Sequence, residues 1–157
     1  MKRSVFLAMV LAAATATVTV TACGDDGGSP PIGGGSMTAT ADGTAFTASL
    51  AVNASRVGNT LAVTAVGANN RQISIQLTGV TAPGSVAIGD GSASYAQLSQ
   101  TSQQWISNIA GGTGTVNVTT LTSTHATGTF TFTGAALTTT GAVGTKTITG
   151  GNFDVSY

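Results

Sequence analysis

Apolar residues recur at every second position in several short stretches of this sequence, and this alternation restricts the fold more than any other feature. A period of two places alternate side chains on one face of a β-strand, whereas a helix needs spacings of three and four. Three stretches follow the pattern: Phe46, Ala48 and Leu50, then Leu61, Val63 and Ala65, then Ile73, Ile75 and Leu77. The sequence therefore predicts half-buried antiparallel strands.

Glycine and aspartate mark the turns between such stretches. Asp42-Gly43 and Gly89-Asp90-Gly91 are typical of tight turns, and a later strand carries Phe130 and Phe132 on one face. There is no long helical stripe, although residues 96–109 have room for one turn of helix. We expect an all-β fold of about eight to ten short antiparallel strands, arranged as a β-sandwich or a small closed or half-closed barrel.

The alternation changes phase near the end of the chain. Ile148 occupies an even position, whereas Phe153, Val155 and Tyr157 occupy odd ones, and Gly150-Gly151 lies at the change. One extra residue in a strand produces this shift and keeps both apolar sets on the same face. We therefore predict a β-bulge near Gly150-Gly151.

The N-terminus has the order of a bacterial lipoprotein signal. Lys2 and Arg3 precede a mainly apolar run, and the segment diluted by threonine ends in Val20-Thr21-Ala22-Cys23. This VTAC tetrapeptide resembles the lipobox of bacterial lipoproteins. The resemblance implies a signal peptide over residues 1–22, cleavage between Ala22 and Cys23, and a lipid on Cys23. The alternative is a secreted protein with one stray thiol.

The residues after Cys23 predict a tether. Residues 24–36 read GDDGGSPPIGGGS, and such a flexible segment has an r.m.s. span of roughly 20 Å. Asp25-Asp26 is either a solubilising pair or a sorting signal. Because residue 24 is Gly rather than Asp, we expect an exported protein held at the outer membrane, on its periplasmic face or at the cell surface. Residues 23–36 are then the lipidated tether, and residues 37–157 are one all-β domain.

Few charges remain after the predicted cleavage. Charged residues make up 6% of the chain, but 41% of its residues are hydrophobic, so the composition does not favour disorder. The mature part has three cations, Arg56, Arg71 and Lys146, against five aspartates, a formal side-chain charge of −2. Nucleic-acid binding needs a cluster of cations that neutralise phosphates, and this sequence excludes it.

Three further segments resemble a family of small, uncharacterised bacterial lipoproteins. The motifs that carry the resemblance are the opening MTATADGTAFTA, the strand motif GTFTF and the closing ITGGNFDV. They cover both ends of the domain, whereas residues 51–113 match only as a strand pattern. The resemblance implies a lipocalin-like or sandwich β domain, and it implies no established activity.

The sequence offers no set of residues for catalysis. There is no Glu, Asp42 and Asp90 precede glycines in predicted turns, and alternation places Asp154 on the solvent side of its strand. His125 is the only histidine, and we expect it at the exposed start of a strand. With one His and a lipidated Cys23, ligands for a metal are too few. We expect a protein that is not an enzyme and has no cofactor or metal.

Binding is the function that the sequence favours. Trp105 and Tyr95 flank the Gln- and Ser-rich residues 97–104, and an aromatic ring beside amides could stack on a sugar or line a pocket. A core Trp and a strand Tyr is the simpler interpretation. Arg56 and Arg71 could pair with an anion, but they lie beside turn residues, so we expect them to be solvated.

These observations leave two functions open. The first is a non-catalytic module that binds a small molecule, a glycan or an envelope protein, with a pocket lined by aromatics such as Trp105. The second is a structural or interaction protein of the envelope, with a filled core and an exposed apolar patch or an open sheet edge.

Overall fold

The computed structural model describes residues 34–157, which form ten strands that pair antiparallel. Two short 3₁₀ turns accompany them, η1 at Ala68–Asn70 and η2 at Thr138–Thr140. The strands are β1 Gly35–Ala41, β2 Thr44–Val57, β3 Thr60–Gly67, β4 Arg71–Leu77, β5 Gly84–Ala87, β6 Tyr95–Gln100, β7 Gln103–Ile106, β8 Thr113–Leu121, β9 His125–Ala136 and β10 Thr145–Ser156. The predicted all-β class and strand number are confirmed.

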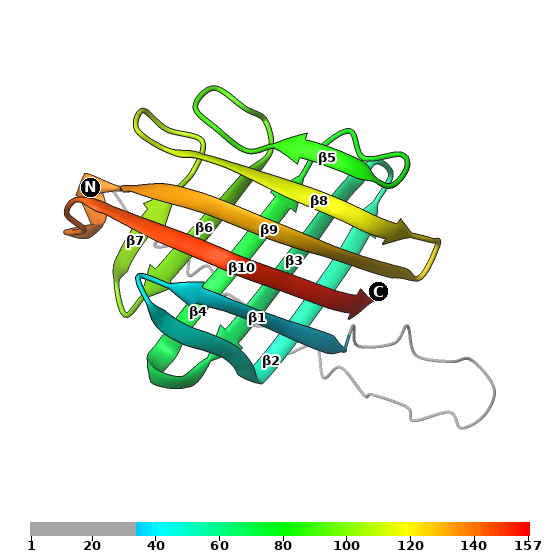
Figure 1. Cartoon of the computed structure of the whole chain (residues 1–157), viewed down its shortest axis with the longest axis horizontal. Coiled ribbons are helices and arrows are strands. Elements are labelled where there is room, and N and C mark those ends of the chain that lie inside the picture. Colours follow the sequence, from blue (N-terminus) through cyan, green and yellow to red (C-terminus); the bar gives the residue numbers. More distant parts are fainter. Residues whose placement is uncertain (1–33) are drawn as a thin grey trace, which may run out of the picture.

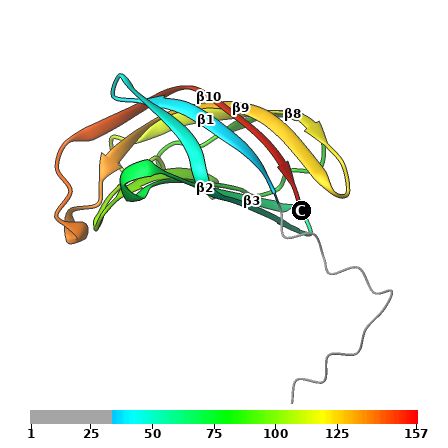
Figure 2. The same ribbon diagram turned by 90° about the horizontal axis from the view of Figure 1, so that it is seen from below.

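The strands form one sheet that closes on itself. Their order is β10-β1-β2-β3-β4-β6-β7-β9-β8-β5, and β9 also pairs with β10, so eight strands make a ring while β8 and β5 extend it beyond β9. The ring is flattened into two curved layers whose strands cross, with β8, β9, β10 and β1 in one layer and β3, β4, β6 and β7 in the other (Figures 1 and 2). This arrangement lies between the predicted sandwich and the predicted small barrel.

The long strand β2 joins the two layers. Its first residues, Thr44–Thr47, pair with β1, and its later residues pair with β3 after a register shift between Ala48 and Ala51. The shift corrects one expectation from the sequence. Leu50 was predicted to share the inner face with Phe46, but it is 67% exposed while Phe46 is buried, because the irregularity turns the strand over between them.

Elsewhere the alternation predicts the core well. All residues of the Leu61 and Ile73 stretches that were assigned to the inner face are buried, as are Phe130 and Phe132. The predicted bulge in β10 is confirmed as well. The pairing of β10 with β9 shifts between Ile148 and Gly151, so that Ile148, Phe153 and Val155 all reach the core.

Residues 96–109, which had room for a turn of helix, contain none. Strands β6 and β7 form a hairpin there instead, with Thr101 in a left-handed conformation (φ 55°) at the turn. Leu98 pairs with Trp105 on the inner face, and burial of these two side chains outweighs any local preference for a helix.

Phenylalanine rings in the core pack directly over glycines of neighbouring strands. The Phe153 ring covers Gly128, and the Phe130 ring covers Gly151; these are directly opposed positions of β9 and β10. Phe46 packs over Gly67 in the same way. A Cβ added at Gly128 would lie 2.6 Å from Phe153 Cζ, and one at Gly151 would lie 2.5 Å from Phe130 Cδ2. The interior holds these rings because the facing residues have no side chain.

We therefore expect Gly128→Ala to destabilise the domain. The added methyl must displace the Phe153 ring or the Asn117 carbonyl, 2.6 Å away, and such overpacking costs about 1–3 kcal/mol. Gly89→Ala is the matched control, because its Cβ would meet atoms only at 3.7 Å or beyond. Chemical denaturation should show a loss for the first variant and none for the second. Equal effects would contradict the packing argument.

The signal peptide (residues 1–22), Cys23 and most of the tether lie outside the described residues. Strand β1 begins at Gly35, two residues before the predicted start of the domain at Met37. In the part of the chain from residue 34 onward, no helix is long and apolar enough to cross a membrane.

Candidate functional site

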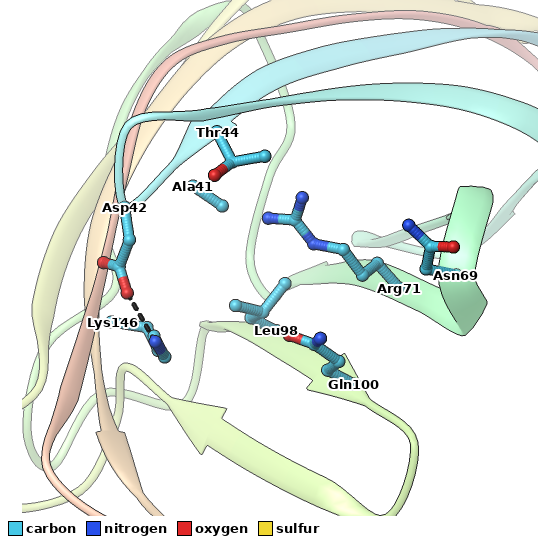
Figure 3. Close-up of a pocket in the computed structure, with 8 residues that line it drawn as sticks. All are labelled: Ala41, Asp42, Thr44, Asn69, Arg71, Leu98, Gln100 and Lys146. Carbon is cyan, nitrogen blue, oxygen red and sulfur yellow. Dashed lines mark ion pairs between the residues drawn. The ribbon is translucent and has the colours of Figure 1, made fainter.

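A polar hollow opens at one end of the ring, which we call the mouth. It lies where the β1–β2 turn, η1, the end of β6 and the start of β10 meet, and its volume is about 240 Å³. Figure 3 shows its walls, which consist of Ala41, Asp42, Thr44, Asn69, Arg71, Leu98, Gln100 and Lys146. Pockets for drug-sized ligands occupy roughly 300–1,000 Å³, so the mouth suits a smaller molecule.

Arg71 points into the mouth from the first position of β4. It shares the inward face with Ile73 and Ile75, and its guanidinium extends across the hollow toward the wall that carries Asp42 and Lys146 (Figure 3). Its Nε is buried and has no hydrogen-bond partner among the described residues. The expectation that Arg71 is solvated is therefore wrong for this nitrogen, because strand alternation, rather than the adjacent turn, sets the direction of the side chain.

An ion pair forms the opposite wall. Lys146 Nζ lies 2.6 Å from Asp42 Oδ2, and the second carboxylate oxygen of Asp42 accepts a hydrogen bond from the Thr147 backbone N–H at 2.8 Å. Together with the charge of Arg71, these bonds hold the pKa of Asp42 below its usual value, the Lys146 bond contributing most. Asp42 and Gly43 both have positive φ, 47° and 75°, as in the hairpin turn predicted from their sequence.

Trp105 supports this wall from inside the core. It is only 3% exposed, its indole N–H donates to the Val143 carbonyl at 3.1 Å, and Lys146 Nζ lies 5.4 Å from the ring centroid. A cation at this distance is attracted to the face of the ring. Trp105 therefore helps to position Lys146 but does not line the mouth.

Tyr95 lies on the opposite face of the sheet from Trp105. It pairs with Gln76 on the outer face of β4 and β6, and its hydroxyl donates to Gln76 Oε1 at 3.3 Å. Leu98, the partner of Trp105, is on the inner face. The two aromatic residues singled out in the sequence are thus not brought together in one site.

A second hollow adjoins the mouth. Its volume is about 330 Å³, and it shares Thr44, Asn69 and Arg71 with the mouth. It extends along the start of β2 and includes Phe46, the one aromatic residue that lines either hollow. Arg71 therefore lines both hollows.

Polar contacts connect the strands at the other end of the ring. Arg56 Nη1 donates to the Thr122 carbonyl at 3.0 Å, and the Tyr157 hydroxyl donates to the same carbonyl at 2.9 Å. Close by, His125 at the start of β9 hydrogen-bonds Asp154 at 2.8 Å, with 35% and 63% of these two side chains exposed. Arg56 thus donates to a backbone carbonyl at an exposed site, Asp154 is exposed as expected, and His125 is half-buried at the start of β9.

The side chains that line the mouth are mainly polar, and two of its three charges are paired. Within residues 34–157, no three residues of the His, Cys, Asp and Glu types gather into a group that could hold a metal ion. The mouth offers one cation with a buried free donor, one neutralised ion pair and the neutral polar side chains of Thr44, Asn69 and Gln100. Such a set can hold and orient a small polar molecule.

Residues 34–154 match the family described as Domain of unknown function (DUF6252). The chain belongs to the DUF6252 family. No curated protein and no solved structure matches it. The DUF6252 segment begins just before β1 and ends within β10, so it contains the whole mouth, including Arg71 and Lys146.

We expect Asp42→Asn to weaken the domain slightly at neutral pH. Asparagine keeps the left-handed turn and accepts the Thr147 N–H, but it removes the charge opposite Lys146. Because both side chains are more than a third exposed, solvent limits the loss to about 0.5 kcal/mol.

The pH dependence of this difference follows from the lowered pKa of Asp42. A depressed folded-state pKa contributes stability above the unfolded-state value of about 3.8, and this contribution disappears as the pH falls through the folded-state value. Denaturant titrations of the two proteins should therefore converge in strong acid. A difference that stays constant down to that pH would contradict this role for the carboxylate.

Proposed function

We propose that this DUF6252 protein is a lipid-anchored envelope protein whose β domain binds a small polar ligand without transforming it. The observation that carries the proposal is the mouth with the buried, unpartnered Nε of Arg71. A buried donor without a partner costs about 1–3 kcal/mol, and more when it is charged. A ligand that accepts a hydrogen bond from this nitrogen would recover that cost.

The lipid anchor is proposed from the VTAC tetrapeptide and Cys23. The direction of β1 relates this anchor to the mouth. Gly35 pairs with Val155 at the end of the ring where the described chain begins, and β1 runs from there to Ala41 at the mouth (Figure 2). With a lipid on Cys23, the mouth would face away from the membrane, toward the compartment that supplies its ligand.

An interaction role in the envelope is the second candidate. Trp105 is part of the core, and among residues 34–157 β5 pairs only with β8, so Gly84–Ala87 presents one edge of the sheet without a described strand beside it. Open edges can accept a strand of another protein. The exposed large apolar residues Leu50, Val57 and Val143 support this role less, since they lie on separate elements.

The anchor is tested by Cys23→Ala. The variant should incorporate no radiolabelled palmitate. In detergent phase partitioning it should move from the detergent phase to the aqueous phase, because firm anchoring needs several acyl chains and the variant cannot carry them. Ser36→Ala is the control and should behave as the parent chain. If the Cys23→Ala variant stays in the membrane fraction although it has incorporated no palmitate, the proposed lipid anchor is refuted.

The binding function is tested by native mass spectrometry of the full chain purified from membranes in mild detergent. We expect a low-mass adduct that disappears on denaturation. Thr44→Trp should abolish it, because residue 44 lies opposite buried Ala41 and projects into the mouth. Thr40→Trp, on the outer side of β1, should retain it. Two outcomes would overturn binding at the mouth. One is an adduct that both variants retain, and the other is the lack of an adduct in the parent chain and in both variants.

A further inference from the structure

We infer that the ligand held at the mouth carries a carboxylate, and that this carboxylate pairs with the guanidinium of Arg71. The inference rests on the proposed binding function and specifies the chemical class of its ligand.

The two cations at the mouth, Lys146 and Arg71, differ in their partners. Lys146 already has two partners, Asp42 at 2.6 Å and the ring of Trp105 at 5.4 Å. Arg71 has no carboxylate within 4 Å among the described residues, so its charge is the one left without a counterion at this end of the ring. The mouth therefore has a net charge of +1, which complements a ligand with a single negative charge.

The geometry of Arg71 favours a planar anion. A guanidinium offers parallel N–H groups in a fixed fork, and two carboxylate oxygens accept from it side by side. One side of the fork includes Nε, which is the buried atom without a partner. A phosphate group carries about −1.5 to −2 charges at neutral pH, and the nearby Asp42 carboxylate would repel the excess.

The rest of the wall limits what the carboxylate can be attached to. Leu98 and Ala41 border the mouth but are only 1% and 3% exposed, whereas Thr44, Asn69 and Gln100 offer neutral donors and acceptors. Gln100 lies directly opposite Arg71 in the pairing of β4 with β6, so its side chain is on the same face. With a volume of about 240 Å³ and these polar walls, the mouth fits a small polar monocarboxylate.

Nitrogen-15 arginine labelling tests this directly, because the full sequence contains only Arg3, Arg56 and Arg71, and Arg3 belongs to the proposed signal peptide. The full chain in detergent is titrated with sodium acetate at constant ionic strength, and acetamide is the neutral isostere. We expect acetate to shift the Arg71 Nε–H signal saturably and to leave the Arg56 signal in place. Acetamide should shift neither signal.

Two conservative variants provide the matched comparison. Arg71→Lys keeps the charge but removes the fork, and it should weaken acetate binding about tenfold, measured from the line broadening of carbon-13 acetate. Arg56→Lys should leave the broadening unchanged. Denaturation curves check that both variants are folded.

The outcomes separate this inference from the binding function on which it rests. The inference that the ligand carries a carboxylate would be refuted if acetamide and acetate had equal effects, or if acetate did not shift the Arg71 signal. If the adduct that Thr44→Trp abolishes is identified as a neutral molecule, the carboxylate is wrong while binding at the mouth stands. An adduct identified as a carboxylic acid, lost in Arg71→Lys and kept in Arg56→Lys, would support both.

Discussion

The fit of phenylalanine rings over glycines is the constraint on which the rest of the structure depends. A ring of eight strands flattened into two layers leaves little interior space, and in this chain Phe46, Phe130 and Phe153 each lie against a residue without a side chain. Larger residues at those glycines would push the layers apart. Because the centre is packed in this way, the mouth opens at one end of the ring and not through its middle.

The two ends of the ring each contain an arginine, and these two arginines differ in their hydrogen bonding. Both Arg56 and Arg71 stand on the inward face of their strands, near opposite ends: Arg56 lies opposite Leu61, which pairs with the last residue of β4, whereas Arg71 is the first residue of β4. Arg56 is bonded to the backbone between β8 and β9. Within residues 34–157, Arg71 has no such partner for its Nε, although its end of the ring contains the Asp42–Lys146 pair. In a chain with so few charges, the two ends thus differ in whether their arginine is bonded to the protein.

Much of the fold could be predicted from local patterns, and the site could not. Alternation identified the strands, and the phase change at Gly150-Gly151 located a bulge because glycine marks it. The irregularity in β2 has no glycine, so the outward turn of Leu50 left no signal in the sequence. The Asp42–Lys146 pair joins residues from the two ends of the domain, and only the closed ring brings them together.

The sequence contained one indication that Arg71 points inward, but the neighbouring turn residues indicated the opposite. Arg71 has the same parity as Ile73, Ile75 and Leu77, so alternation placed it inward. The adjacent Asn69 and Asn70 suggested a solvated turn instead, and both do adopt positive φ, 58° and 54°. The strand begins at Arg71 itself, so the parity rule already applies to its side chain.

The position of β1 has a mechanical consequence. This first strand is hydrogen-bonded to β10 along its length and to β2 near the mouth, so a pull on Gly34 along the axis of β1 would load these bonds. Antiparallel hydrogen bonds are perpendicular to the strand, so such a load acts on them in shear and is shared among them. A domain held in this way would resist tension from its leading segment, whereas peeling at a sheet edge would break the bonds one at a time.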